Sequence, residues 1–178
     1  AFLGDKKGGL AMSTVVACGM FSAISGSSIA TAATMSKVAM PEMRRYKYAD
    51  SLATASIAAG GTLGILIPPS VILVIYGLLT EQSIGKLFMA GFIPGFIGIV
   101  FYTLAVEFVV ARDASLGPAG ERTEWKERLL ALKDVWTTLA LFIFVIGGIY
   151  IGLFSATEAA GMGAAGALLI TFLKGALS

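Results

Sequence analysis

The chain has 178 residues, of which 57% are hydrophobic and 13% are charged, and its formal net charge is +2 at pH 7. Because soluble domains carry roughly 25% charged residues, this composition excludes an ordinary soluble domain and predicts an all-α polytopic membrane protein. The small net charge gives no indication of nucleic-acid binding. The lack of histidine removes the commonest metal ligand and proton shuttle.

Five stretches carry no charged residue, and about 20 apolar residues are enough to cross a bilayer. These stretches are residues 10–36, 51–80, 87–106, 135–157 and 159–173. The chain begins at Ala1, without a methionine and without a cleavable signal pattern before the first stretch. We therefore expect a piece of a longer membrane protein.

The first stretch is predicted to form a re-entrant helical hairpin over residues 10–40. One continuous helix would be roughly 40 Å long, and its centre, Ser25-Gly26-Ser27-Ser28, is a poor helix sequence. Each half has about 12 residues, which is too few to span a bilayer. Basic residues flank both sides, so we expect the chain to enter and return with its tip near Gly26. A single spanning helix is the alternative.

The second stretch is predicted to be a discontinuous transmembrane helix over residues 50–79. Three glycines between residues 60 and 64, followed by Pro68-Pro69, interrupt any helix there. Irregular backbone at membrane depth survives only where protein or a water-filled cavity satisfies it, and secondary transporters build sites from such breaks. The first half should end in free carbonyls that favour a cation. The second half, from Ser70 to Leu79, should begin with free N–H groups that favour an anion.

The distribution of basic residues predicts the side of the membrane on which each connector lies. If the chain starts inside, dips through the hairpin and crosses at the four later stretches, Lys86 is the only basic residue outside. The other 12 of the 13 basic residues then lie inside: Lys6, Lys7, Lys37, Arg44, Arg45, Lys47, Arg112, Arg122, Lys126, Arg128, Lys133 and Lys174. A plain first helix would put the first two lysines on the wrong side, so the hairpin is favoured.

Residues 111–134 are predicted to be a cytoplasmic connector with an amphipathic helix, and residues 135–178 to hold two transmembrane helices. Between residues 123 and 136, large apolar side chains repeat at intervals of three and four, which places them on one helix face: Trp125, Leu129, Leu132 and Trp136. Ser155 and Glu158 have the spacing of a capping box. The glycine-rich run over residues 161–166 predicts close helix packing.

Two segments place polar oxygen atoms inside the predicted bilayer. The hairpin carries the hydroxyls of Ser22, Ser25, Ser27, Ser28, Thr31 and Thr34, and the break adds Thr62, Ser70 and the backbone carbonyls around Gly64 and Ile67. A sodium ion needs several oxygen ligands and a carboxylate needs N–H and O–H donors, so these groups suit both without a charged side chain. The alternative is packing, since small residues are common at membrane helix contacts and serines often bond to the i−4 carbonyl.

Four stretches resemble the large permease subunit of the tripartite ATP-independent periplasmic (TRAP) transporters of bacteria and archaea. They are ISGSSIATAA at 24–33, AAGGTLGILIPPS at 58–70, LFMAGFIPG at 87–95 and FSATEAA at 154–160. Family members are more than twice as long as this chain. The resemblance implies an inverted-repeat fold in which residues 1–110 form the transport region of the first repeat and residues 135–178 begin the second. The second hairpin would then be missing.

The resemblance also implies a function in the cytoplasmic (inner) membrane. A sodium ion, with no other cofactor, would drive import of a carboxylate such as a C4-dicarboxylate or a sugar acid. A periplasmic substrate-binding protein would deliver the substrate, and a small membrane subunit would brace the permease. The family's sodium site maps onto Ser22 and Ser25 and onto the carbonyls of Gly64, Ile67 and Pro69. The expected substrate contacts, placed from the position of the hairpin tip and the break, are Ser27, Ser28, Thr31, Thr62 and Ser70.

Two other classes of function stay open from the residues alone. A passive channel or a structural membrane subunit is the main alternative, although one polar cluster is not a lined pore. An integral membrane enzyme is disfavoured, because the predicted membrane segments hold no Asp or Glu pair and the chain has no histidine. The single cysteine, Cys18, is predicted to be a small packing residue. No Walker-type phosphate loop is present, so the chain is not expected to hydrolyse ATP by that route.

Overall fold

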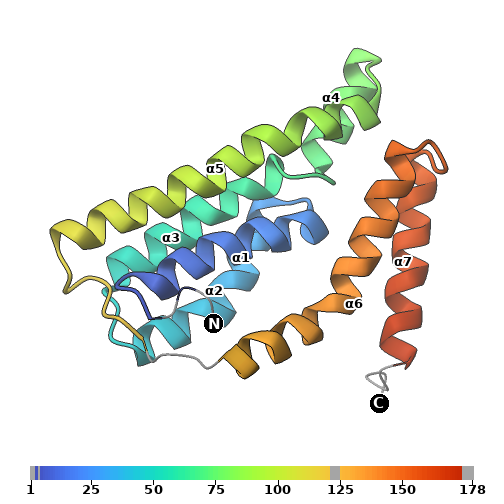
Figure 1. Ribbon diagram of the computed structural model, residues 1–178. Coiled ribbons are helices and arrows are strands. Elements are labelled where there is room, and N and C mark those ends of the chain that lie inside the picture. The colour runs from blue at the N-terminus through green and yellow to red at the C-terminus, as the bar shows by residue number, and fades with distance from the viewer. Residues whose placement is uncertain (1–2, 4, 121–124, 174–178) are drawn as a thin grey trace. The chain divides into compact units, whose positions relative to one another are not determined.

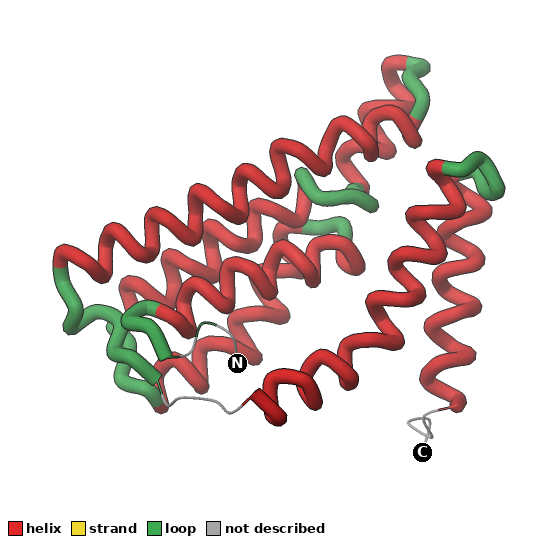
Figure 2. Tube along the Cα trace, viewed as in Figure 1, coloured by secondary structure: helices red, strands yellow, loops and turns green. Residues whose placement is uncertain are grey.

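The computed structural model describes residues 3, 5–120 and 125–173 (Figure 1). The regular elements within these ranges are seven α-helices and one short 3₁₀ helix, without a strand (Figure 2). The prediction of an all-α protein is therefore confirmed for this part of the chain. The helices form two compact units, and the boundary between them falls after residue 124. The predicted domain boundaries at residues 110 and 134 stay predictions.

The first two helices of the first unit form a helical hairpin. Helix α1 (Gly9–Ser25) ends at Gly26, which adopts the left-handed conformation with a φ of 59° and donates its N–H to the Ser22 carbonyl at 2.9 Å. Helix α2 (Ser28–Arg45) then begins, with Ser27 as its N-cap. The predicted turn at Gly26 is confirmed. The second arm runs past residue 40, because charged residues do not end a helix, and basic side chains in the last turn suit its dipole.

The predicted interruption of the second stretch is also present. Helix α3 (Asp50–Thr62) leads into the 3₁₀ helix η1 (Leu63–Ile65), and helix α4 (Val71–Thr80) starts after a non-helical segment. The break, defined here as residues 63–70, includes a cis peptide bond between Pro68 and Pro69. Helix α4 begins one residue later than expected, because Ser70 is its N-cap.

Small residues allow α3 to pack closely against both arms of the hairpin. A Cβ at Gly60 would lie 2.8 Å from the Cβ and Sγ atoms of Cys18 on α1, and a Cβ at Gly61 would lie 2.9 Å from the Cβ of Ala32 on α2. Cys18 is fully buried at this contact, which confirms its predicted role as a packing residue. The two arms of the hairpin therefore pack directly against the first half of the broken helix.

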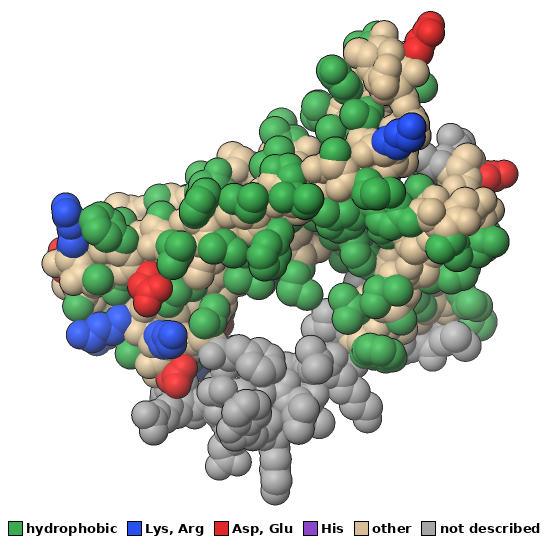
Figure 3. All heavy atoms as spheres, turned by 45° about the horizontal axis from the view of Figure 1, so that its top comes forward, with side chains coloured by type: hydrophobic (Ala, Val, Ile, Leu, Met, Phe, Trp, Pro, Cys, Tyr) green, Lys and Arg blue, Asp and Glu red, His purple; other side chains and the backbone are tan. Residues whose placement is uncertain are grey.

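Helix α5 (Ile84–Arg112) lies along the same unit and presents a large apolar surface. Among the described helices, α5 is the one that is long and apolar enough to cross a membrane. At about 1.5 Å per residue, its length exceeds the thickness of the hydrocarbon core of a bilayer. Ile93, Phe96 and Phe101 are each at least 65% exposed. Figure 3 shows hydrophobic side chains over much of this face and charged ones toward the helix ends. Such a patch suits contact with lipid or protein rather than with water.

Three connections of the first unit meet at one end of it. The N–H of Gly8 donates to the Gly117 carbonyl at 2.8 Å, and the N–H of Ala49 donates to the Leu116 carbonyl at 3.0 Å. The hydroxyl of Tyr48, which follows α2, accepts the N–H of Leu10 in the first turn of α1 at 3.1 Å. The start of α1, the end of α2 and the loop after α5 therefore lie at the same end.

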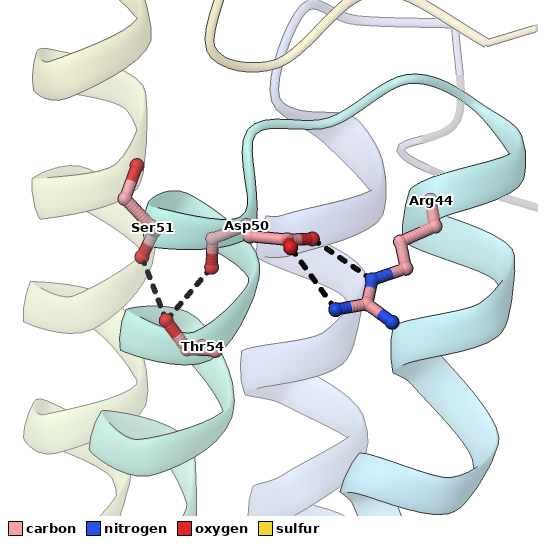
Figure 4. Close-up of polar contacts among 4 residues, drawn as sticks. All are labelled: Arg44, Asp50, Ser51 and Thr54. Atoms are coloured by element: carbon pink, nitrogen blue, oxygen red, sulfur yellow. Dashed lines mark hydrogen bonds and ion pairs between the residues drawn. The ribbon is translucent and has the colours of Figure 1, made fainter.

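An ion pair joins α2 to α3 at this end (Figure 4). The guanidinium of Arg44 donates to both carboxylate oxygens of Asp50, at 2.9 and 3.0 Å. Its hydrogen bonds hold the pKa of the Asp50 carboxyl below its usual value. The Thr54 hydroxyl donates to the carbonyls of Asp50 and Ser51 in the first turn of α3.

The second unit consists of helices α6 (Trp125–Tyr150) and α7 (Ala156–Leu173), which pack against each other. The predicted connector helix and the following span are one continuous helix, because the chain has neither glycine nor proline between residues 125 and 146 to end it. Trp136 is 62% exposed, whereas the side chains of Trp125, Leu129 and Leu132 lie outside the described residues. Their predicted common face stays a prediction.

In the second unit the predicted capping box is confirmed, and the predicted close packing of residues 161–166 is confirmed only in part. The N–H and the hydroxyl of Ser155 both donate to the Glu158 carboxylate at 2.8 Å, and the N–H of Glu158 donates to the Ser155 hydroxyl at 3.3 Å. This is the reciprocal pattern of a capping box, and these bonds lower the pKa of the Glu158 carboxyl. A Cβ at Gly166 would lie 2.5 Å from Leu141 Cδ1 on α6, as close helix packing requires, whereas a Cβ at Gly161 would meet none of the described neighbouring atoms within 4 Å.

Candidate functional site

The tip of the hairpin lies directly against the break in the second helix. A Cβ at Gly64 would lie 2.7 Å from the Ser27 carbonyl oxygen, and a Cβ at Gly26 would lie 2.7 Å from the Pro69 carbonyl oxygen. The N–H of Val71, the first residue of α4, donates to the Gly26 carbonyl at 3.2 Å. Glycine is required at both positions because the two backbones approach too closely for a side chain. The predicted meeting of serine-rich tip and break is therefore present.

The backbone of the break leaves two carbonyl groups without their usual local donors. The Gly64 carbonyl cannot receive an i+4 bond, because residue 68 is proline, and the i+3 N–H of Ile67 donates to the Leu63 carbonyl at 3.0 Å. The i+4 donor for the Ile67 carbonyl is the N–H of Val71, which donates to Gly26 instead. These carbonyls can accept a bond from elsewhere, and a cation is one candidate partner.

Two hydroxyl side chains donate to nearby carbonyls, one in the last turn of α3 and one within the break. The Thr62 hydroxyl donates to the Ala59 carbonyl at 2.7 Å, and the Ser70 hydroxyl donates to the Ile65 carbonyl at 2.8 Å. Thr62 and Ser70 were both predicted to contact a substrate. In the structure each satisfies a helix-end carbonyl, and Ser70 is only 1% exposed. Sequence spacing cannot show which carbonyl a hydroxyl will reach.

The start of α4 offers fewer free donors than expected. The N–H of Val71 is bonded to Gly26, and the N–H of Leu73 donates to the Ser70 hydroxyl at 3.4 Å. The expectation of an open helix start for an anion is therefore corrected. The hairpin tip and the N-cap take up two of the groups that an anion would need.

The hydroxyls of the hairpin fall into a buried set and an accessible set. Ser22 is fully buried and donates to the Cys18 carbonyl at 2.6 Å. The hydroxyls of Ser25 and Thr31 lie 2.6 Å apart, and Thr31 is fully buried. Ser27 and Ser28 at the tip are partly exposed. The Ser27 hydroxyl accepts the N–H of Ala30 at 3.4 Å and so keeps its proton available.

The structure thus brings some predicted site residues together, whereas the hydroxyl of one of them has its partners away from the hairpin tip. The tip serines lie at the break beside Gly64 and Pro69, and Ile67 contacts α1, where its Cδ1 lies 3.4 Å from the position of a Cβ at Gly19. Thr62 is the last residue of α3, and its hydroxyl contacts the Ala59 carbonyl and, at 3.1 Å, the hydroxyl of Tyr102 on α5.

A face of α5 that sequence reasoning missed forms the other wall of the break. Cβ atoms at Gly91, Gly95 and Gly98 would lie 2.5 Å from the Leu66 carbonyl oxygen, 2.6 Å from Ile67 Cγ1 and 2.8 Å from Leu63 Cδ2. The spacing of four, three and then four residues to Tyr102 places all four on one helix face. That periodicity was present in the sequence, but nothing local indicates which helix it faces.

The atoms at this junction that could bind a cation are uncharged oxygens of backbone carbonyls and hydroxyls. Among the described residues, no group of three or more His, Cys, Asp or Glu side chains could hold a metal ion. Backbone carbonyls and serine hydroxyls are hard ligands, which suit hard cations such as Na⁺ rather than transition metals. A hairpin packed against an interrupted apolar helix, together with one helix of membrane-spanning length, is the arrangement expected of a helical integral membrane protein.

Comparison with known proteins narrows this class to one family. The DctM component of the tripartite ATP-independent periplasmic transporters matches residues 1–178. The chain is 42% identical over 165 residues to the C4-dicarboxylate TRAP transporter large permease protein DctM of Pseudomonas aeruginosa. This match covers 92% of this chain and 38% of that protein. The chain belongs to the DctM family of TRAP transporter large permease subunits.

Other relatives carry different substrate names. The ectoine TRAP transporter large permease protein TeaC of Halomonas elongata is 38% identical, covering 97% of this chain and 40% of that protein. The sialic acid TRAP transporter large permease protein SiaM of Vibrio cholerae is 35% identical, covering 96% of this chain and 39% of that protein. The chain therefore spans about two fifths of the length of the relatives it matches. All three are named as transporter permease proteins rather than enzymes.

Proposed function

We propose that this chain forms the first ion- and substrate-binding half of a sodium-coupled secondary transporter that imports an organic acid. The observation that carries the proposal is the hairpin tip packed into the break, where the Gly64 and Ile67 carbonyls have lost their local hydrogen-bond donors. Such irregular backbone within a membrane protein is typical of transport sites.

The proposed sodium site lies between the end of α1 and the break. Its ligands are the carbonyl oxygens of Gly64, Ile67 and Pro69 and hydroxyls of the hairpin, Ser22 and Ser25. The Ser22 proton already points to the Cys18 carbonyl, so the lone pairs of this oxygen stay available to a cation. Sodium bound here would connect the hairpin to the break and so stabilise the tip.

The proposed substrate contact is the accessible part of the tip. Ser27 and Ser28 are partly exposed and carry hydroxyl groups, and their backbone atoms lie close to Gly64. Thr31, Thr62 and Ser70, also expected from the sequence, already make hydrogen bonds within the protein, so a carboxylate would have to displace these partners. We therefore rank the tip serines first. The relatives' substrate names differ, so the organic acid is proposed only as a class that includes C4-dicarboxylates and sugar acids.

Binding of sodium and binding of the substrate would be coupled by their opposite charges and by the hairpin tip that both contact. A cation and a carboxylate bound side by side neutralise each other, which lowers the cost of moving either through hydrocarbon. If sodium orders the tip that presents the serines, each ligand binds better when the other is present, and such coupling is reciprocal. No charged side chain lies at the described hairpin tip or break.

The proposed setting is the inner membrane of a bacterium or archaeon. The start of α1, the end of α2 and the loop after α5 lie at one end, which supports a re-entrant hairpin with both flanks inside. The proposed partners are a small membrane subunit and a periplasmic substrate-binding protein, in keeping with the tripartite description of the family.

Uptake by the complete transporter in proteoliposomes tests this function. An inward sodium gradient should drive accumulation of a labelled C4-dicarboxylate or sugar acid in the presence of the binding protein, and a potassium gradient should not. Preloaded substrate should accelerate entry of labelled substrate, because a carrier exchanges. A passive channel would leak substrate without counterflow, and that result would contradict the proposal.

Two variants test the placement of the sodium site. Ser25→Ala removes a proposed ligand, and Gly64→Val forces a side chain against the Ser27 backbone. Each should raise the half-activating sodium concentration on the order of tenfold, as expected for losing an interaction with a charged partner. Gly161→Val is the matched control, because a Cβ added there would meet no neighbouring atom within 4 Å in the part of the chain that the structure describes. Normal sodium activation in both site variants, at normal expression, would remove the assignment.

A further inference from the structure

A pair of hydroxyl groups joins the end of α3 to α5. Thr62 is the last residue of α3, and its Oγ1 lies 2.7 Å from the Ala59 carbonyl oxygen and 3.1 Å from the Tyr102 hydroxyl oxygen. A carbonyl oxygen can only accept, so the Thr62 proton points to Ala59. The proton between the two hydroxyls must then belong to Tyr102. The phenol therefore donates to Thr62 and fixes the direction of its hydroxyl.

Tyr102 is at one end of the α5 face that supports the break. The three glycines of this face, Gly91, Gly95 and Gly98, provide room for the backbone and apolar side chains of the break. Their contacts are steric. The hydrogen bond from Tyr102 also restricts the orientation of the end of α3, because a hydrogen bond weakens steeply as its angle departs from linear.

We propose that Tyr102 is a positioning residue for the sodium site, an inference that rests on the proposed function. By donating to Thr62, Tyr102 keeps that hydroxyl on the Ala59 carbonyl and anchors the last turn of α3 to α5. Gly64 follows two residues later, so the orientation of its carbonyl depends on this anchor. Tyr102 itself does not touch the ion. Its effect therefore passes through Thr62.

Sodium activation of uptake by the complete transporter separates this role from a structural one. Tyr102→Phe removes the hydroxyl and keeps the ring. It should raise the half-activating sodium concentration about three- to tenfold, the range expected for one lost hydrogen bond, and leave the maximal rate unchanged. Tyr76→Phe is the matched control, because Tyr76 is 53% exposed on α4, outside the contact between α3 and α5. Its activation curve should match that of the wild type.

Variants of Thr62 test whether Tyr102 acts through it. Thr62→Val should shift the half-activating concentration at least as far as Tyr102→Phe, and Thr62→Ser, which keeps a hydroxyl, should restore values near the wild type. The double variant Thr62→Val with Tyr102→Phe should behave as Thr62→Val alone, because the two residues share one pathway. Additive shifts would overturn the inference.

The remaining outcomes distinguish the inference from the function on which it rests. A wild-type transporter without sodium activation would overturn both. A sodium-activated wild type whose Tyr102→Phe variant has the same half-activating concentration would overturn the inference alone. A variant that loses maximal rate at an unchanged sodium requirement would assign Tyr102 to stability and would also overturn it.

Discussion

The carbonyl of Gly26 accepts the N–H of Val71 at 3.2 Å, which ties the turn of the hairpin to the first turn of α4. The two residues belong to different charge-free stretches and are 45 positions apart in the sequence. This bond takes the donor that would otherwise serve the Ile67 carbonyl. One contact therefore holds the hairpin against the break and leaves a carbonyl available beside it.

Gly26→Ala should destabilise this junction for two reasons. The residue has a φ of 59°, and an added Cβ would lie 2.7 Å from the Pro69 carbonyl oxygen. Gly152→Ala is the matched control, because its φ is 76° but an added Cβ would meet no described neighbouring atom within 4 Å. Left-handed strain alone costs about 1–2 kcal/mol, and the clash should add about 1–3 kcal/mol at Gly26. Equal losses of thermal stability in the two variants would show that the contact with Pro69 is unimportant.

The hydroxyls of Ser25 and Thr31 should be energetically coupled. They lie 2.6 Å apart across the hairpin turn, and Thr31 is fully buried. Ser25→Ala and Thr31→Val each remove one partner, and each should lower the free energy of unfolding by about 1–2 kcal/mol. The double variant should lose less than the sum, with a coupling of about 1 kcal/mol. Thermal unfolding of the purified permease measures this cycle, and strict additivity would show that the pair does not interact.

The ion pair between Arg44 and Asp50 should make a small, pH-dependent contribution to stability. The Arg44 guanidinium lowers the pKa of the Asp50 carboxyl below its usual value of about 3.9. A depressed folded-state pKa stabilises the protein above the unfolded-state pKa, and this stabilisation is lost as the pH falls through the folded-state value. Asp50→Asn should therefore lower the unfolding midpoint slightly at pH 7, since exposed pairs contribute little.

The same variant provides its own control at acid pH. The difference in unfolding midpoint between wild type and Asp50→Asn should stay constant from pH 8 to about pH 5 and should vanish below the folded-state pKa. High salt at pH 7 should also reduce it, because the pair is exposed to solvent. A difference that persists at acid pH would assign the effect to something other than the ion pair.

Lys47 offers a stabilising substitution at the end of the hairpin. Its φ is 58°, and its N–H donates to the Arg44 carbonyl at 3.0 Å in the manner of a helix C-cap. Glycine adopts this conformation without the Cβ penalty, so Lys47→Gly should raise the free energy of unfolding by about 0.5–1 kcal/mol. Lys37→Gly, in the interior of α2, should lower it by about 1 kcal/mol. Destabilisation by both variants would contradict the assigned backbone conformation.

The local features of the fold could be predicted because each has a signal within a few residues. The glycines and prolines between residues 60 and 69 predicted the break, Gly26 predicted the turn, and Ser155 with Glu158 predicted the cap. The end of α2 was misjudged, because charge marks the edge of an apolar run but does not stop a helix. The connector helix and the span from residue 135 were expected as separate elements for the same reason, whereas they form the continuous helix α6.

The partners of the polar groups could not be predicted, because they depend on contacts between distant segments. Spacing identified Thr62 and Ser70 as hydroxyls near the break but not that they would satisfy the Ala59 and Ile65 carbonyls. The pairing of Thr62 with Tyr102 spans 40 residues and leaves no local pattern. The helix start at Val71 was expected to be open, and only the folded hairpin shows what fills it.

Sodium-dependent hydrogen exchange of the complete transporter tests the central claim most directly. We expect amides of residues 24–31 and 62–73 to exchange more slowly in sodium than in potassium at equal ionic strength, because an ion between the hairpin tip and the break would stabilise both. Amides of α6 and α7 should be unchanged. Equal exchange of both segments in the two salts, in a transporter whose uptake requires sodium, would contradict an ion site at this junction.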